Sequence, residues 1–134
     1  MVLLDTHAIL WLDNGDPLSE TAHQAIRQAA VSGGVLVSPV SAWELGLLVK
    51  RARITLDLEP LAWFRRFLDG AGVRLVPLSI EAAIRSSFLP DTFHGDPADR
   101  LLVATARELD VPFVTRDRRI LRHGAGALLR TVAC

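Results

Sequence analysis

Hydrophobic residues in this chain form short runs that alternate with longer amphipathic stretches. The short runs are rich in Val, Leu and Phe and end at turn or polar residues, which is typical of buried strands. They predict strands at residues 2–5, 35–37, 73–76 and 113–115, with an edge strand at 128–132. The longer stretches predict helices at residues 8–12, 41–52, 60–68, 80–88, 97–109 and 118–121, and one more that Ser19 caps and Gly33 ends.

Strands separated by helical stretches predict parallel pairing with right-handed crossovers. The expected fold class is therefore α/β: a sandwich with a central, mainly parallel sheet of four to five strands and helices on both faces. No repeat, linker or low-complexity segment divides the chain. We expect residues 1–134 to form a single domain, which is long enough to bury a core without disulfides.

Composition excludes several classes of protein. Half of the residues are hydrophobic, so the chain is not disordered. The chain has one cysteine, Cys134, and therefore no disulfide framework. Its four histidines do not have the spacing of a zinc site, so the sequence contains no recognisable zinc motif. Asp5 interrupts the first hydrophobic run, and no apolar run approaches the roughly 20 residues that a membrane-spanning helix needs. We expect a cytoplasmic protein that does not enter a membrane.

The net charge is zero, which argues against a general basic coat for nucleic acid. Arginines nevertheless gather around Asp117, after the strand predicted at residues 113–115, and guanidinium groups suit phosphate recognition. Arg116, Arg118 and Arg119 are therefore weak candidates for contacts with a substrate phosphate. The alternative is that they form an ordinary solvated face.

Four separate stretches each end a hydrophobic run or open a helix with an acidic residue. These acids are Asp5, Glu44, Asp99 and Asp117. The carboxyl ends of parallel strands converge on one crevice, so acids at those ends form a single cluster. Clustered carboxylates repel one another and must share protons or hold a cation, and all-oxygen sites suit Mg²⁺ or Mn²⁺. The pattern predicts a metal-dependent hydrolase, with phosphodiesters as the leading substrate class.

Each of these acids also has a structural interpretation. Asp5 can cap the first helix, and Ser41 with Glu44 fits a capping box. Asp96, which precedes Pro97, has the pattern of a helix N-cap and is either a further metal ligand or only a cap. Asp117 can cap the short helix that follows it. The joint placement of four acids, rather than any one of them, supports the metal hypothesis.

Four segments together resemble a known family. They are residues 3–11 (LLDTHAILW), 41–45 (SAWEL), 94–106 (HGDPADRLLVATA) and 114–117 (VTRD). Their order and spacing are similar to those of the PIN domain, and more narrowly to VapC-type toxins of bacterial type II toxin–antitoxin systems. The likeness spans nearly the whole chain, and the first and third segments are its specific part.

This resemblance implies a PIN-like α/β/α sandwich whose metal-binding acids correspond to Asp5, Glu44, Asp99 and Asp117. Asp96 matches a position that is common in this subgroup. The positions that carry supporting hydroxyl groups in the family correspond to Thr6 and Thr115. The family further implies an Mg²⁺- or Mn²⁺-dependent ribonuclease that acts on RNA, a homodimer, and a cognate antitoxin protein that blocks the site.

Three other functions compete with this interpretation. Haloacid-dehalogenase phosphatases need Asp-x-Asp after the first strand, whereas the residue two after Asp5 is His7. A response-regulator receiver needs a lysine at a late strand end, and Lys50 is the only lysine in the chain. The remaining alternative is a non-catalytic PIN-like scaffold that binds RNA or protein. Metal-dependent turnover distinguishes that scaffold from an enzyme.

Overall fold

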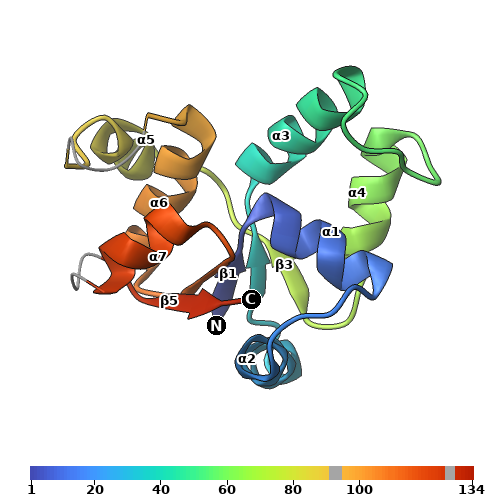
Figure 1. Cartoon of the computed structure of the whole chain (residues 1–134), viewed down its shortest axis with the longest axis horizontal. Helices are drawn as coiled ribbons and strands as arrows, with labels where there is room; N and C mark the ends of the chain where they lie inside the picture. The colour runs from blue at the N-terminus through green and yellow to red at the C-terminus, as the bar shows by residue number, and fades with distance from the viewer. Residues whose placement is uncertain (91–94, 126–128) are drawn as a thin grey trace.

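A computed structural model describes residues 1–90, 95–125 and 129–134. The described chain forms five strands and seven helices (Figure 1). In chain order they are β1 (Val2–Leu4), α1 (Thr6–Asn14), α2 (Glu20–Val31), β2 (Val35–Val37), α3 (Pro39–Lys50), α4 (Pro60–Leu68), β3 (Val73–Leu75), α5 (Ile80–Ser86), α6 (Pro97–Leu109), β4 (Phe113–Thr115), α7 (Arg118–Ala125) and β5 (Thr131–Ala133).

The described strands form one parallel sheet in the order β3-β2-β1-β4-β5. This confirms the predicted α/β class with its parallel sheet. The chain moves outward from β1 through β2 to β3 and then crosses to β4 on the other side of β1. Strand order therefore reverses between β1 and β4, the place where open parallel sheets bind ligands.

Alternating residues of the strands pack into two separate hydrophobic cores. Leu4 of β1 packs with α1, α2 and α4, whereas its neighbour Leu3 packs with α6 and α7. Because successive side chains of a strand point to opposite faces, one short strand anchors both helical layers. Figure 1 shows the result, with α5, α6 and α7 on one side of the sheet and α1, α2 and α4 on the other.

Helix α3 begins earlier than the sequence pattern indicated. The Ser38 hydroxyl caps it by accepting the Val40 backbone N–H at 3.1 Å, and Pro39 is its first residue. The predicted start at Ser41 and end at residue 52 were therefore wrong by two residues each. Ser38-Pro39 is itself a start signal, a capping side chain followed by a proline that needs no hydrogen-bond partner.

Other boundaries shift by a few residues. Helix α1 spans 6–14 instead of 8–12, and α7 runs to Ala125 instead of 121. Helix α5 ends at Ser86 rather than 88, and β3 ends at Leu75 rather than 76. The edge strand is β5 at Thr131–Ala133, and residue 128 of its predicted range lies outside the described residues. In the described part of the chain, no helix combines the length and apolarity that crossing a bilayer requires.

Candidate active site

Asp5 lies where β1 meets α1 and is 9 % exposed. One of its carboxylate oxygens accepts the Thr6 backbone N–H at 2.7 Å and caps α1. The other oxygen accepts the hydroxyl of Thr115, at the end of the neighbouring strand β4, also at 2.7 Å. The capping role considered for Asp5 and its position at the strand end are therefore both present.

Glu44 is held by a side chain, not by the capping box that its spacing with Ser41 suggested. It is the sixth residue of α3, so it lies in the second turn. Its carboxylate accepts the Thr6 hydroxyl at 2.5 Å. The Thr6 oxygen also lies 3.0 Å from the hydroxyl of buried Ser41, one turn before Glu44. Thr6 therefore links the end of β1 to α3 and orients the glutamate.

Asp99 is the third residue of α6, and Asp96 is the N-cap of that helix. The Asp96 carboxylate accepts the backbone N–H groups of Ala98 at 3.0 Å and Asp99 at 3.4 Å. The capping interpretation of Asp96 is thus present in the structure. The same contacts fix the backbone from which the Asp99 side chain projects.

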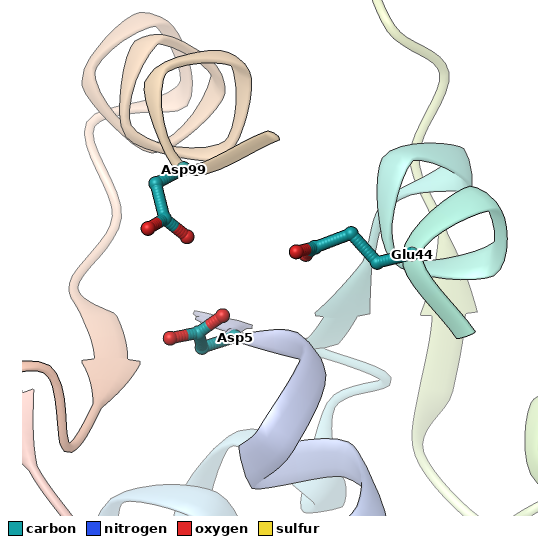
Figure 2. Close-up of side chains that lie close together, drawn as sticks. All are labelled: Asp5, Glu44 and Asp99. Atoms are coloured by element: carbon teal, nitrogen blue, oxygen red, sulfur yellow. The ribbon is translucent and has the colours of Figure 1, made fainter. Parts of the chain in front are cut away.

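Three of the predicted acids come together in space. Each of Asp5, Glu44 and Asp99 offers a carboxylate oxygen, and these three oxygens lie within 4.8 Å of one another. Figure 2 shows the side chains pointing toward a common point from the end of β1, from α3 and from the start of α6. That point lies beside β1, at the carboxyl edge of the sheet where strand order reverses.

In this acidic triad, Asp5–Glu44–Asp99, the ionised form of the carboxylates is disfavoured when no cation is bound. Burial raises the pKa of Asp5 above its ordinary value, although the Thr115 and Thr6 hydrogen bonds oppose the rise. Burial also raises the pKa of Glu44. Burial, followed by the charges of Asp5 and Asp96, raises the pKa of Asp99 to about 8. The metal-free triad therefore retains a proton near neutral pH.

Asp117 stands next to the triad but outside that group of three. One of its carboxylate oxygens accepts the backbone N–H groups of Arg119 at 2.8 Å and Ile120 at 3.2 Å. Its own backbone N–H is donated to the Thr115 hydroxyl at 3.1 Å. Its charge still contributes to the raised pKa of Asp5 and Asp99. Asp117 therefore caps the start of α7 and lies close enough to affect the triad.

The three arginine candidates differ in their surroundings. The Arg116 guanidinium donates to the backbone carbonyls of Pro17 at 3.1 Å and Cys134 at 2.9 Å. It also lies 3.8 Å from the centre of the Trp11 ring. These contacts give Arg116 a structural role. Arg118 and Arg119 are exposed in the first turn of α7, beside Asp117.

The donor set fits a small divalent cation. Oxygen ligands on opposite sides of an octahedral Mg²⁺ are about 4.2 Å apart, since each bond is about 2.1 Å. The 4.8 Å limit within the triad exceeds this by roughly half an ångström, which small side-chain rotations or a bridging water remove. Asp5, Glu44 and Asp99 can therefore hold one such ion between them. A cation at this point offsets the burial and the neighbouring carboxylate charges that together raise the Asp99 pKa, and this favours binding of the cation.

Sequence reasoning missed the role of Ser41, which it assigned to a helix cap. Ser41 instead lies inside α3 with its hydroxyl against Thr6. The signal was its spacing: Ser41 and Glu44 are three residues apart, so they share one face of a helix. Had the helix start been placed at Ser38-Pro39, this shared face would have been recognisable.

Comparisons with known proteins bear on the family of this chain. The PIN domain family model matches residues 2–126. Ribonuclease VapC22 of Mycobacterium tuberculosis (strain ATCC 25618 / H37Rv) is 39% identical over 124 residues, which cover 91% of this chain and 91% of that protein.

Two solved structures share the fold at low sequence identity. VapBC2 from Rickettsia felis, bound to a DNA fragment from its promoter, contains a chain that is 14% identical with a TM-score of 0.71, covering 99% of this chain and 98% of that one. DNA-bound VapBC from Salmonella typhimurium gives 18% identity and a TM-score of 0.69, covering 98% and 96%. The family match over nearly the whole chain and the 39% identity to a VapC ribonuclease show that this chain belongs to the PIN domain family.

Proposed function

We propose that this chain is an Mg²⁺- or Mn²⁺-dependent endoribonuclease that hydrolyses RNA phosphodiester bonds as the toxin of a toxin–antitoxin pair. The acidic triad at the switch point of the sheet is the observation that carries the proposal. The 39% identity to a protein named as a ribonuclease supports RNA as the substrate. We further propose that the protein acts in the cytoplasm.

Each acid of the triad has a distinct role in the proposed metal site. Asp5 is the fixed ligand, because a backbone N–H and the Thr115 hydroxyl hold its two oxygens. Glu44 is the second ligand, oriented by Thr6. Asp99 is the third and gives up its proton when the site fills, because its pKa is about 8 in the metal-free protein. A divalent cation bound there polarises the scissile phosphate and makes a water molecule more acidic.

The residues around the triad complete the site. Asp117 supplies further negative charge from just outside it, and we assign it to the catalytic set as a fourth acid, oriented by Thr115. Asp96 acts as the cap that fixes Asp99. We assign Arg118 and Arg119, which are exposed in the first turn of α7 beside Asp117, to contacts with RNA phosphates.

A cognate antitoxin is the proposed protein partner. The matched structures include VapBC assemblies and, from Klebsiella pneumoniae, a toxin–antitoxin complex that is 20% identical with a TM-score of 0.59, covering 87% of this chain and 87% of that one. A cavity of about 720 Å³ beside α1 and α4 is available for a segment of such a partner. Its lining includes Asp13, Asp16 and Asp57, the first and last of which pair with Arg66 in the same lining, and the indole of Trp11. The excess of acidic over basic groups and the indole favour a peptide that carries both basic and apolar side chains.

Helix α5 offers a surface for the proposed homodimer. Ile80 (75% exposed) and Ile84 (58%) lie one turn apart on the helix, and Phe88 (80%) follows just after its end. Antiparallel packing of two copies about Ile84 sets Ile80 of one copy against Phe88 of the other. The same arrangement brings Glu81 beside Arg85 across the interface. This self-complementarity is what a two-fold interface requires.

Cleavage of total RNA by the purified protein tests the proposed function. We expect discrete fragments with Mg²⁺ or Mn²⁺, none with EDTA, and none from Asp5→Asn, in which asparagine preserves the helix cap. Asp69→Asn removes an exposed carboxylate at the end of α4 and is the matched control, with unchanged cleavage. Metal-independent cleavage, or full activity of Asp5→Asn, would contradict the proposal. Metal binding without cleavage of any RNA would favour the non-catalytic scaffold.

A further inference from the structure

Arg100 occupies an unusual position for a cation. It is the fourth residue of α6 and directly follows Asp99. The first turn of a helix carries the positive end of the helix dipole, where basic residues are unfavourable. The side chain is also half-buried, which costs further free energy for a charged group unless its donors are paired. The contacts of its guanidinium group explain its presence there.

The Arg100 guanidinium reaches away from α6 to the end of α5. Its Nε donates to the backbone carbonyl of Ser86 at 3.0 Å, and one terminal nitrogen donates to the carbonyl of Leu89 at 3.1 Å. Ser86 is the last residue of α5, so its carbonyl has no partner within that helix and lies at the negative end of the dipole. One planar fork therefore joins the end of α5 to the start of α6.

Asp99 needs such an anchor more than the other two acids of the triad. Asp5 directly follows β1, and Glu44 lies on the helix that follows β2 with only Ser38 between them. In the described part of the chain, helix α6 instead follows another helix, and no strand leads directly to Asp99. Its backbone is held on one side by the Asp96 cap and on the other by the fork of Arg100.

We propose that Arg100 is a positioning residue, which sets the first turn of α6 through its contacts with the Ser86 and Leu89 carbonyls so that Asp99 reaches the triad. This inference rests on the proposed metal-dependent function. The proposed role of Arg100 is to orient the Asp99 side chain and not to supply charge to the site. A lysine at this position keeps the charge but cannot reproduce two donors in a fixed plane.

The opposite end of the same helix pair offers a matched control. There the Ser79 hydroxyl caps α5 by accepting the Ala82 backbone N–H at 2.9 Å and donates to the Glu108 carboxylate of α6 at 2.6 Å. Ser79→Ala therefore loosens α5 against α6 without altering the end that carries Asp99. If Arg100 only stabilises the packing of α5 on α6, replacing Arg100 and replacing Ser79 should weaken metal binding at the triad to a similar degree.

The test measures Mn²⁺ affinity of the purified full chain by electron paramagnetic resonance of free Mn²⁺, together with thermal melts. Losing a group that orients a metal ligand typically weakens affinity by about 10- to 100-fold. We expect Arg100→Gln to weaken Mn²⁺ binding about tenfold or more and Arg100→Lys to weaken it several-fold. Ser79→Ala should lower the melting temperature but leave the Mn²⁺ affinity within about twofold of the wild type.

Each contrary result has a definite meaning. Wild-type affinity in Arg100→Gln overturns the inference, and so does wild-type affinity in Arg100→Lys, because charge alone would then suffice. Equal loss of affinity in Ser79→Ala also overturns it, because general loosening would explain the effect. If Arg100→Gln does not fold, Arg100→Lys and Ser79→Ala decide the question. A wild-type protein that binds no Mn²⁺ instead overturns the proposed function on which the inference rests.

Discussion

Replacing Asp99 by asparagine should make the metal-free protein more stable, even though it removes a proposed ligand. In the folded chain Asp99 has a pKa of about 8, raised first by burial and then by the charges of Asp5, Asp96, Glu44 and Asp117. Its ordinary value is 3.8. The carboxylate form is therefore disfavoured by folding, and an uncharged amide of the same shape avoids that penalty.

The magnitude follows from the difference between the two pKa values. About four pH units correspond to a ceiling of ~6 kcal/mol in the free energy of unfolding once Asp99 is ionised. Asp5 and Glu44 also have raised pKa values and share the retained proton, so asparagine relieves only part of the repulsion. We expect a gain of about 2–3 kcal/mol at pH 8.5, or roughly 6–12 °C in melting temperature for a domain of this size.

The sign of the pH dependence is equally specific. Between pH 4 and pH 8 the unfolded chain has lost the Asp99 proton while the folded chain keeps it. The unfolded state then binds fewer protons, so the free energy of unfolding falls as pH rises through this window. The wild type in EDTA should therefore be less stable at pH 8.5 than at pH 5.5, and Asp99→Asn should lose much of this slope.

Thermal and urea melts in EDTA at both pH values measure the effect. Asp69→Asn, which removes an exposed carboxylate far from the triad in sequence, should stay within about 0.5 kcal/mol of the wild type. Adding Mn²⁺ at pH 8.5 should stabilise the wild type and leave Asp99→Asn nearly unchanged. An Asp99→Asn protein that is no more stable than the wild type at pH 8.5 in EDTA would show that burial and the neighbouring carboxylates do not disfavour the Asp99 carboxylate.

Three further substitutions test other parts of the account. Thr115→Val removes the hydroxyl that donates to buried Asp5, so the free energy of unfolding from melts should fall by about 1–3 kcal/mol and Mn²⁺ should bind more weakly in a titration. Unchanged Mn²⁺ affinity would argue against a supporting role for the Thr115 hydroxyl. Arg116→Ala loses the contact with the Trp11 ring and two carbonyl partners, so the free energy of unfolding should fall by about 1–2 kcal/mol while the Mn²⁺ affinity stays the same. An unaltered melting temperature would contradict the structural role of Arg116. Ile84→Glu should convert the proposed dimer to a monomer in sedimentation, whereas Val31→Glu, at a 90% exposed position on α2, should not; a dimer that survives Ile84→Glu places the interface elsewhere.

Positions that follow a strand were the most predictable part of the site. The apolar run before Asp5 and the Phe113–Thr115 run each form a parallel strand as expected, because short buried runs with β-branched and aromatic residues have few alternatives. Helix α6 was also predicted with its observed bounds, since Asp96-Pro97 marks its start and apolar spacing marks its buried face. Two of the three acids in the triad follow from these assignments.

The environment of Glu44 was less predictable. Two start signals lie three residues apart, Ser38 and Ser41, and local sequence does not say which hydroxyl caps the helix. The contact between Ser41 and Thr6 joins residues 35 positions apart, which no local pattern encodes. The carbonyl contacts of Arg100 are equally invisible in sequence, because their partners Ser86 and Leu89 lie 14 and 11 positions away. Pairings of this kind depend on how the helices pack on the sheet.

The central claim is that Asp5, Glu44 and Asp99 hold a divalent cation. Anomalous X-ray diffraction from a crystal grown with Mn²⁺ at pH 8 tests it most directly. We expect one strong anomalous peak at the triad, with each of the three carboxylates either placing an oxygen at about 2.0–2.4 Å from the ion or accepting a hydrogen bond from a water that is bound to it. A crystal saturated with Mn²⁺ that shows no peak within reach of these three side chains, or a peak only elsewhere on the protein, would contradict it.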